Sequence, residues 1–211
     1  MRQKLLYTII IFLFLSVNSF AKNLKFTKII VLDKPWGSSF INNNELIISE
    51  KSGKIKIVNI ENSDNNEIDH NLNFLESGQG GLLDIIYKDG FVWISYTEDR
   101  GNLKTSTSIA KGKFNRKKIF FKNIFQANPP IDSSYHFGSR LVIKDNYIFA
   151  SLGERGQGMI AQDFSSHPGS IIRIHLDGTI PIDNPKFKEK KNWLSEVYQI
   201  GVRNPQGLTL S

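Results

Sequence analysis

Short runs of apolar residues, separated by polar turns, cover most of this chain. The runs favour β-structure, and Asn, Asp and Gly stand in the turns between them, as expected for antiparallel meanders. The predicted strands are residues 38–41, 46–49 and 55–60, then 82–87, 91–96, 106–114 and 118–122, then 140–143, 147–152 and 170–175, and finally 207–210. No convincing amphipathic helix lies between them, so the pattern predicts an all-β protein.

The predicted strands fall into sets that repeat about every 40 to 50 residues. This period is typical of a β-propeller, in which each set forms one blade; a sandwich or jelly roll is the alternative. A glycine-containing loop heads each set, at residues 35–40, 78–83, 136–141 and 203–208, and this recurrence favours the propeller. A propeller closes with about 4 to 8 blades, whereas this sequence supplies about three blades and the start of a fourth. We therefore expect the chain to be a fragment, truncated at its C-terminus.

The N-terminus has the features of an exported protein. Basic residues precede an apolar run at residues 5–17, and the small residues Ser19 and Ala21 follow it. A membrane-spanning helix needs roughly 20 apolar residues, so this shorter run is better interpreted as a signal peptide at residues 1–21. We expect a periplasmic or secreted protein with no stable membrane span after cleavage.

The composition of the chain bears on its partners and on the source of its stability. The chain has 27 basic and 20 acidic residues, so it is basic overall, but the Lys and Arg residues are scattered apart from short runs at 116–118 and 188–191. This distribution argues against a nucleic-acid partner. There are no cysteines, so stability must come from packing rather than from disulfides. Residues 22–211 are expected to form one partial propeller domain, with the polar stretch 62–71 as an exposed turn between sheets.

Three of the loops carry polar side chains from which an active site could be built. These side chains are Gln79, His136 and the adjacent pair Arg203 and Asn204. If the loops open equivalent strands of successive blades around a common axis, the side chains converge on one spot. Each also has an ordinary structural interpretation: the histidine can cap a loop, the arginine can pair with a carboxylate, the asparagine can start a turn, and the glutamine can bond to backbone in a tight turn.

No metal site is predicted within the chain. The remaining histidines, His70, His167 and His175, lack metal-ligand spacing with acidic residues and are interpreted as surface or structural residues. Trp36 and Trp93 are expected to pack within the blades.

Six short motifs, taken together, point to a family. They are KPWG at residues 34–37, GQGGLLD at 78–84, HFGSRL at 136–141, LGERG at 152–156, DGTIPIDNP at 177–185 and RNPQGL at 203–208. With these motifs in the family's order, the sequence resembles the soluble, pyrroloquinoline quinone (PQQ)-dependent glucose and sorbosone dehydrogenases, which include the periplasmic aldose sugar dehydrogenases. The family fold is a six-bladed β-propeller with the quinone over the central channel, so the resemblance implies that fold here.

The resemblance implies catalytic roles for three residues. These enzymes oxidise the C1 hydroxyl of an aldose to a lactone, and the histidine that matches His136 takes the hydroxyl proton while the hydride passes to PQQ. The carboxylate that matches Glu154 would orient the imidazole, although the family usually has Asp here and Glu is one methylene longer. The guanidinium that matches Arg203 would stabilise negative charge on the quinone.

The resemblance also implies cofactor contacts. Arg203 and Asn204 would hydrogen-bond the quinone, and Gln79 would reach the cofactor edge or a sugar hydroxyl. Many family members have His at the position of Val202, so a polar group is missing beside the site without loss of a catalytic residue.

The implied cofactors are PQQ and calcium. The calcium-binding loop would lie downstream of residue 211, so the chain as given is expected to be inactive. The implied partners are a small-molecule sugar and an electron acceptor that the sequence does not identify. The alternative is a non-catalytic exported propeller that binds a carbohydrate or protein ligand, because a fold does not determine a function.

Overall fold

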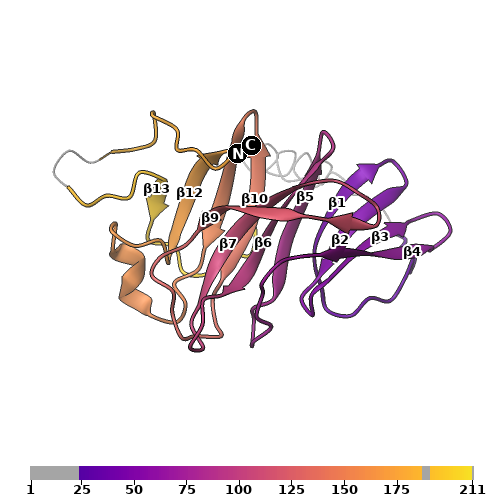
Figure 1. Cartoon of the computed structure of the whole chain (residues 1–211), viewed down its shortest axis with the longest axis horizontal. Coiled ribbons are helices and arrows are strands. Elements are labelled where there is room, and N and C mark those ends of the chain that lie inside the picture. Colours follow the sequence, from indigo (N-terminus) through magenta and orange to yellow (C-terminus); the bar gives the residue numbers. More distant parts are fainter. Residues whose placement is uncertain (1–23, 187–190, 211) are drawn as a thin grey trace, which may run out of the picture.

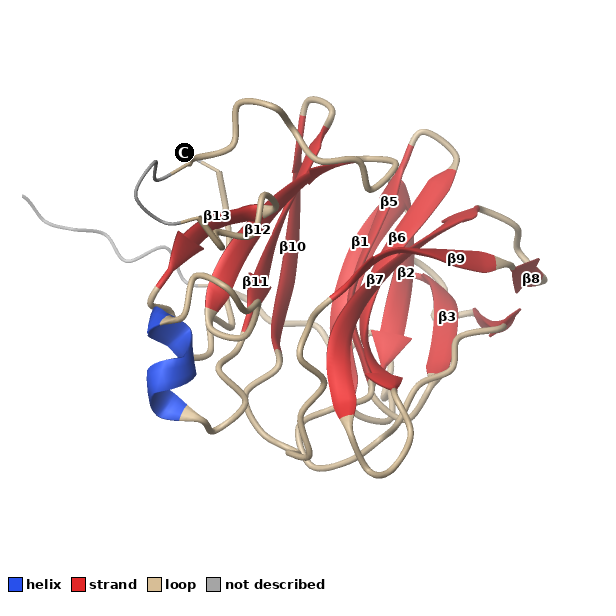
Figure 2. Cartoon of the chain, turned by 60° about the vertical axis from the view of Figure 1, so that its left-hand side comes forward, coloured by secondary structure: helices blue, strands red, loops and turns tan. Residues whose placement is uncertain are grey.

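The computed structural model describes residues 24–186 and 191–210, and it contains three successive sheets, each built on a meander of four antiparallel strands (Figure 1). The first sheet contains β1 (Pro35–Asn42), β2 (Glu45–Glu50), β3 (Lys54–Asn59) and β4 (Asn65–His70), with the short strand β8 (Lys118–Ile119) parallel to β4. The second contains β5 (Leu82–Lys88), β6 (Phe91–Asp99), β7 (Thr105–Lys113) and β9 (Phe121–Gln126). The third contains β10 (Gly138–Lys144), β11 (Tyr147–Leu152), β12 (Ser170–His175) and β13 (Val197–Ile200). The 3₁₀ helix η1 (Gly158–Gln162) lies between β11 and β12 (Figure 2).

The prediction of an all-β fold is confirmed. Closure into a six-bladed propeller stays a prediction, and the predicted signal peptide, residues 1–21, lies outside the described residues. In the part of the chain that the structure describes, residues 24–186 and 191–210, no helix has the length and hydrophobicity of a membrane span.

The prediction of an exposed turn at residues 62–71 is wrong, because this polar stretch contains β4. Only Ile68 of that strand is buried, and the remaining side chains are exposed or half-buried. An outer strand needs few apolar residues because its backbone pairs with β3 while most of its side chains meet solvent. The hydrophobic pattern therefore missed it.

The strands predicted at residues 118–122 and 207–210 also differ from the structure. The first divides into β8, which pairs with β4 of the first sheet, and the beginning of β9, which pairs with β7. Residues 207–210 form no strand, because no described strand hydrogen-bonds with them.

The second sheet packs between the other two. Along β6, Val92 and Ile94 face the core shared with the first sheet, whereas Trp93 between them faces the core shared with the third. Successive strand side chains point to opposite faces, so a strand that is covered on both sides is apolar at consecutive positions. Trp93 is 2 % exposed, and its indole N–H donates to the carbonyl of Leu176 at 3.1 Å. The prediction that Trp93 serves packing is confirmed.

A buried serine in the second strand of each sheet joins that sheet to the next segment of the chain. These serines are Ser49, Ser95 and Ser151, each 0 % exposed. Each hydroxyl oxygen accepts a backbone N–H from the first strand of its own sheet, the donors being Gly37 (3.1 Å), Asp84 (2.9 Å) and Arg140 (3.0 Å). Each hydroxyl donates to a carbonyl further along the chain, the acceptors being Leu83, Ser139 (2.6 Å) and Pro205 (3.3 Å).

These serine bridges sit where the pairing of the first two strands of each sheet is irregular. A hydroxyl there supplies the hydrogen bond that the irregular ladder lacks. Because Pro205 accepts in the same way as Leu83 and Ser139, the segment that follows β13 takes the place that β5 and β10 take in the second and third sheets.

Replacing Ser95 with alanine should destabilise the protein. The change leaves the Asp84 N–H and the Ser139 carbonyl buried without their partner, and an unpaired buried polar group costs about 1–3 kcal/mol. We expect Ser95→Ala to lower the free energy of unfolding by that amount in a urea titration. Ser38→Ala, at an exposed position of β1, should change it by less than about 0.5 kcal/mol. Equal effects of the two changes would contradict the bridge.

Candidate active site

His136 stands on the loop that leads into β10, and other segments of the chain hold its backbone. Its φ of +52° lies in the left-handed region, which residues other than glycine rarely adopt. Its N–H donates to Gln79 Oε1 at 2.8 Å, and its carbonyl accepts the Arg155 N–H at 3.2 Å. A Cβ atom on Gly153 would lie 1.9 Å from that carbonyl oxygen, so the close approach requires glycine there. Loops of the second and third sheets together determine where His136 lies.

Glu154 holds the imidazole ring of His136. Nδ1 of the ring is hydrogen-bonded to Glu154 Oε1, and the other carboxylate oxygen accepts the Gly158 N–H at 2.6 Å. The side chain of Glu154 is 3 % exposed and that of His136 is 20 % exposed. A carboxylate at Nδ1 favours the tautomer with its proton there, which leaves the lone pair on Nε2. No described residue hydrogen-bonds Nε2, so this atom is available to a ligand.

The surroundings of Glu154 keep its carboxylate charged. Burial by itself raises the pKa of this carboxyl, but hydrogen bonds from His136 and the Gly158 N–H, with the charge of Arg203, bring the pKa below its usual value. The carboxylate can therefore support a positive charge on the imidazole at neutral pH.

Arg203 and Asn204 approach the same place from the segment after β13. The carbonyl of Arg203 accepts the Glu154 N–H at 2.8 Å, and its Nε lies 3.9 Å from Glu154 Oε1. The Arg203 side chain is nevertheless 82 % exposed, so the described residues hold its guanidinium only loosely. Asn204 Oδ1 accepts the N–H of Gly138, the second residue after His136, at 3.0 Å.

A cavity of about 390 Å³ lies beside these loops. Its lining combines residues of all three sheets with residues after β13, namely Trp36, Lys51, Gly78, Gln79, Leu83, Phe137, Gly138, Asn204 and Gln206. The structure thus brings the predicted cofactor-binding residues Gln79 and Asn204 to one cavity. It brings His136, Glu154 and Arg203 together next to it, through the contacts described above.

A second polar contact between the sheets, centred on Arg140, was not predicted from the sequence. The Arg140 guanidinium lies 4.1 Å from the centroid of the Trp36 ring, and its Nη1 is 3.4 Å from Asp84 Oδ1. Its Nε donates to the carbonyl of Gln206 at 2.8 Å. Burial raises the pKa of the Asp84 carboxyl, while the Leu141 N–H and Arg140 act in the opposite direction. Trp36, expected to pack within a blade, is half-buried and lines the cavity.

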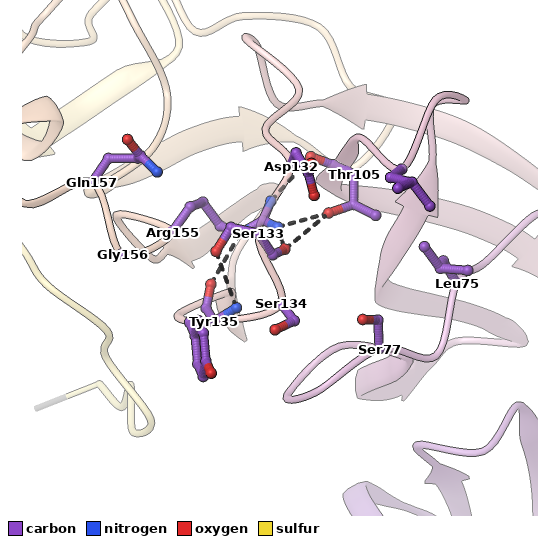
Figure 3. A pocket seen from close by; sticks show the side chains of 11 residues that line it. Leu75, Ser77, Thr105, Asp132, Ser133, Ser134, Tyr135, Arg155, Gly156 and Gln157 are labelled. Carbon is purple, nitrogen blue, oxygen red and sulfur yellow. Dashed lines mark hydrogen bonds between the residues drawn. The ribbon is translucent and has the colours of Figure 1, made fainter.

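A second cavity, of about 500 Å³, also borders the loop that carries His136 (Figure 3). Tyr135, Arg155 and Gln157 line it, and Figure 3 shows them with the neighbouring residues. None of the five residues predicted for the site is part of its lining. The predicted chemistry therefore belongs to the other side of this loop.

The three loops that carry the predicted site residues take equivalent positions relative to the sheets, but they differ in chemistry. The serine bridges align three carbonyls, those of Leu83, Ser139 and Pro205. Gly80, His136 and Val202 each lie three residues before one of these carbonyls, so the three residues are equivalent in position. The imidazole therefore occurs at one of the three aligned positions, since Gly80 has no side chain and the side chain of Val202 has no acid–base group.

Among the described residues, no group of three or more His, Asp and Glu side chains could hold a metal ion. The other histidines make structural contacts. His70 Nε2 is 2.8 Å from the carbonyl of Gly53, and His167 Nε2 is 2.8 Å from Glu196 Oε1. The ring of His175 lies beside that of Tyr147.

Residues 32–211 match the family described as glucose / sorbosone dehydrogenase. The match covers most of the chain and includes every residue of the site. The chain belongs to the glucose and sorbosone dehydrogenase family, as its motifs indicate.

Two curated proteins and one solved structure show how the chain relates to this family. It is 31 % identical over 190 residues to the aldose sugar dehydrogenase YliI of Escherichia coli (strain K12), and the matched region covers 85 % of this chain and 51 % of that protein. It is 28 % identical over 228 residues to quinoprotein glucose dehydrogenase B of Acinetobacter calcoaceticus, covering 90 % and 47 %. The crystal structure of the soluble aldose sugar dehydrogenase from Escherichia coli in the apo-form matches with a TM-score of 0.80 and 30 % identity, covering 85 % of this chain and 55 % of that one. The chain thus spans about half the length of the relatives it matches.

The stability that Glu154 contributes should depend on pH. Because its pKa is lowered in the folded protein, the ionised carboxylate stabilises the fold above its ordinary pKa of 4.5, and this contribution is lost as the pH falls through the folded value. We expect wild type to exceed Glu154→Gln in free energy of unfolding at pH 7, and the difference to shrink toward pH 3 in urea titrations. The exposed Glu61→Gln is the control. A difference for Glu154→Gln that is constant across this range would contradict the assignment.

Proposed function

We propose that the complete protein is a quinoprotein oxidoreductase that oxidises the C1 hydroxyl of aldose sugars to lactones, with PQQ as cofactor. The observation that carries the proposal is the pairing of His136 with a buried carboxylate, which leaves Nε2 unpaired by any described residue. Family membership supports the oxidoreductase class, and the Acinetobacter calcoaceticus relative is a quinoprotein glucose dehydrogenase. Because the chain spans about half of that relative, the activity is proposed for the complete protein.

In this proposal His136 is the general base. Oxidation of a sugar hemiacetal removes the proton of the C1 hydroxyl and a hydride from C1; PQQ, when bound, supplies the acceptor for the hydride. The proton passes to Nε2 of His136. The imidazolium that results keeps its Nδ1–H on Glu154, and the ionised carboxylate stabilises the new positive charge.

The residues that line the cavity of about 390 Å³, which include Gln79 and Asn204, suit PQQ. PQQ is a flat anion with carboxylate and carbonyl oxygens. The side-chain oxygens of Gln79 and Asn204 already accept backbone N–H groups, so their amide NH₂ groups are the ends that remain to donate. Lys51 adds a positive charge to the lining and Trp36 an aromatic face. With the exposed guanidinium of Arg203 next to Asn204, these residues would hold the cofactor.

Other features of the complete protein are part of the same proposal. Calcium would be bound outside the described residues, among which no group of three His, Asp or Glu side chains could hold it. Six blades would close the ring of which the three described sheets form part. The signal peptide at residues 1–21 would direct the protein to the periplasm or the outside of the cell.

Replacing His136 should abolish most of the activity. In the complete protein reconstituted with PQQ and Ca²⁺, we expect His136→Gln to lower kcat for aldose-dependent dye reduction by about 10²- to 10⁴-fold, since the proton loses its acceptor. His175→Gln is the matched control, because that ring contacts Tyr147 away from the site. Equal rates for His136→Gln and wild type would eliminate the base. A folded wild type that reduces no dye would instead favour a non-catalytic binding propeller.

A further inference from the structure

Arg155 is a buried arginine with no carboxylate partner in the part of the chain that the structure describes. It is 3 % exposed, and burial lowers the pKa of its guanidinium to about 10. Buried charges are usually paired because an uncompensated charge in the interior is unfavourable. The groups that Arg155 contacts therefore indicate its role.

The groups that contact the side chain of Arg155 are all neutral, and Figure 3 shows Ser133, Tyr135 and Thr105 among them. Nε donates to the carbonyl of Tyr135 at 3.1 Å, and Nη2 donates to the carbonyl of Ser133. Nη1 donates to the carbonyl of Thr105 at 3.0 Å, and Nη2 also donates to Thr105 Oγ1 at 2.6 Å. The guanidinium carbon lies 3.8 Å from the centroid of the Phe137 ring. One side chain thus joins the loop 133–137 to the first residue of β7.

These contacts surround His136. Tyr135 and Phe137 are its immediate neighbours, and the Arg155 N–H donates to the His136 carbonyl itself. Glu154, the preceding residue, binds the imidazole. Two consecutive residues therefore hold the two halves of one histidine. Glu154 holds the ring. Arg155 holds the main chain at and before His136 and packs on the ring of the residue after it.

We propose that Arg155 is a positioning residue that keeps His136 in its left-handed backbone conformation and so keeps Nε2 directed toward the substrate. This inference rests on the proposed role of His136 as the base. A planar guanidinium can donate to several carbonyls at once, which a lysine ammonium or an uncharged side chain cannot reproduce in the same geometry. Arg155 does not line the cavity that is proposed to hold PQQ and reaches it only through Phe137, so its loss should misplace the base without removing a cofactor contact.

The test uses Arg155→Met and Arg155→Lys in the complete, PQQ- and Ca²⁺-reconstituted protein. A misplacement of about 1 Å can cost on the order of 10²-fold in rate. We expect Arg155→Met to lower kcat by about 10- to 100-fold with KM for the sugar and PQQ affinity within about two-fold, and Arg155→Lys to recover part of the loss. Thr105→Val, which removes one anchor but keeps the arginine, should give a smaller loss and serves if Arg155→Met does not fold.

Arg173→Met is the matched control, because Arg173 is a largely buried arginine of β12 that binds Asp183 and Asn184. It should lower Tm while leaving kcat within about two-fold. If Arg155→Met lowers Tm but keeps wild-type kcat, or if Arg173→Met loses as much kcat, the positioning role is refuted.

A second readout does not depend on activity. The proton on Nδ1 of His136, hydrogen-bonded to a carboxylate, should give a downfield NMR resonance that His136→Gln lacks. We expect this resonance to shift or disappear in Arg155→Met and to persist in Arg173→Met. A wild type without sugar oxidation would end the proposed function, yet this resonance would still decide whether Arg155 positions the ring. A resonance unchanged in Arg155→Met would overturn the inference.

Discussion

A buried hydroxyl shared between consecutive sheets is the interaction on which the rest of this structure depends. Ser49, Ser95 and Ser151 each accept from their own sheet and donate to the next segment. Because a hydroxyl has one proton and a fixed reach, it sets how far one sheet can slide against the next. The loops ahead of β5 and β10, and the segment after β13, consequently arrive at the same level and can contact one another.

The site is an outcome of that alignment. His136 receives its backbone contacts from Gln79 and Arg155 and its ring contact from Glu154. Asn204 binds the backbone two residues later. A non-glycine residue at positive φ costs energy, and such strain persists only where the surroundings over-determine the conformation. Here every polar backbone group of His136 has a partner, which explains how the strained conformation can be kept.

Much of the fold was predictable because strands with one or two buried faces leave an apolar pattern. The outer strand β4 left none, since its only buried side chain is Ile68. At the candidate site, the motifs predicted Gln79, His136, Glu154, Arg203 and Asn204, but not how these residues contact one another. The side-chain oxygen of Gln79 accepts the backbone N–H of His136, and Nε of Arg203 lies 3.9 Å from Oε1 of Glu154. Arg155 could not be predicted because its partners are mostly backbone carbonyls, which every residue carries. Arg140 could not be predicted because its side-chain partners, Trp36 and Asp84, belong to other sheets.

The all-β class, the family and the residue types available for acid–base chemistry could be read from the amino-acid sequence, because strand periodicity and short motifs are local properties of the chain. The packing of the sheets determines which of those residues lie at one cavity and which nitrogen of the imidazole has no hydrogen-bond partner among the described residues. The structure alone shows that a buried arginine holds the loop of the histidine. Hydrogen bonds between residues far apart along the chain depend on how the sheets pack, and a linear pattern carries no distance between sheets.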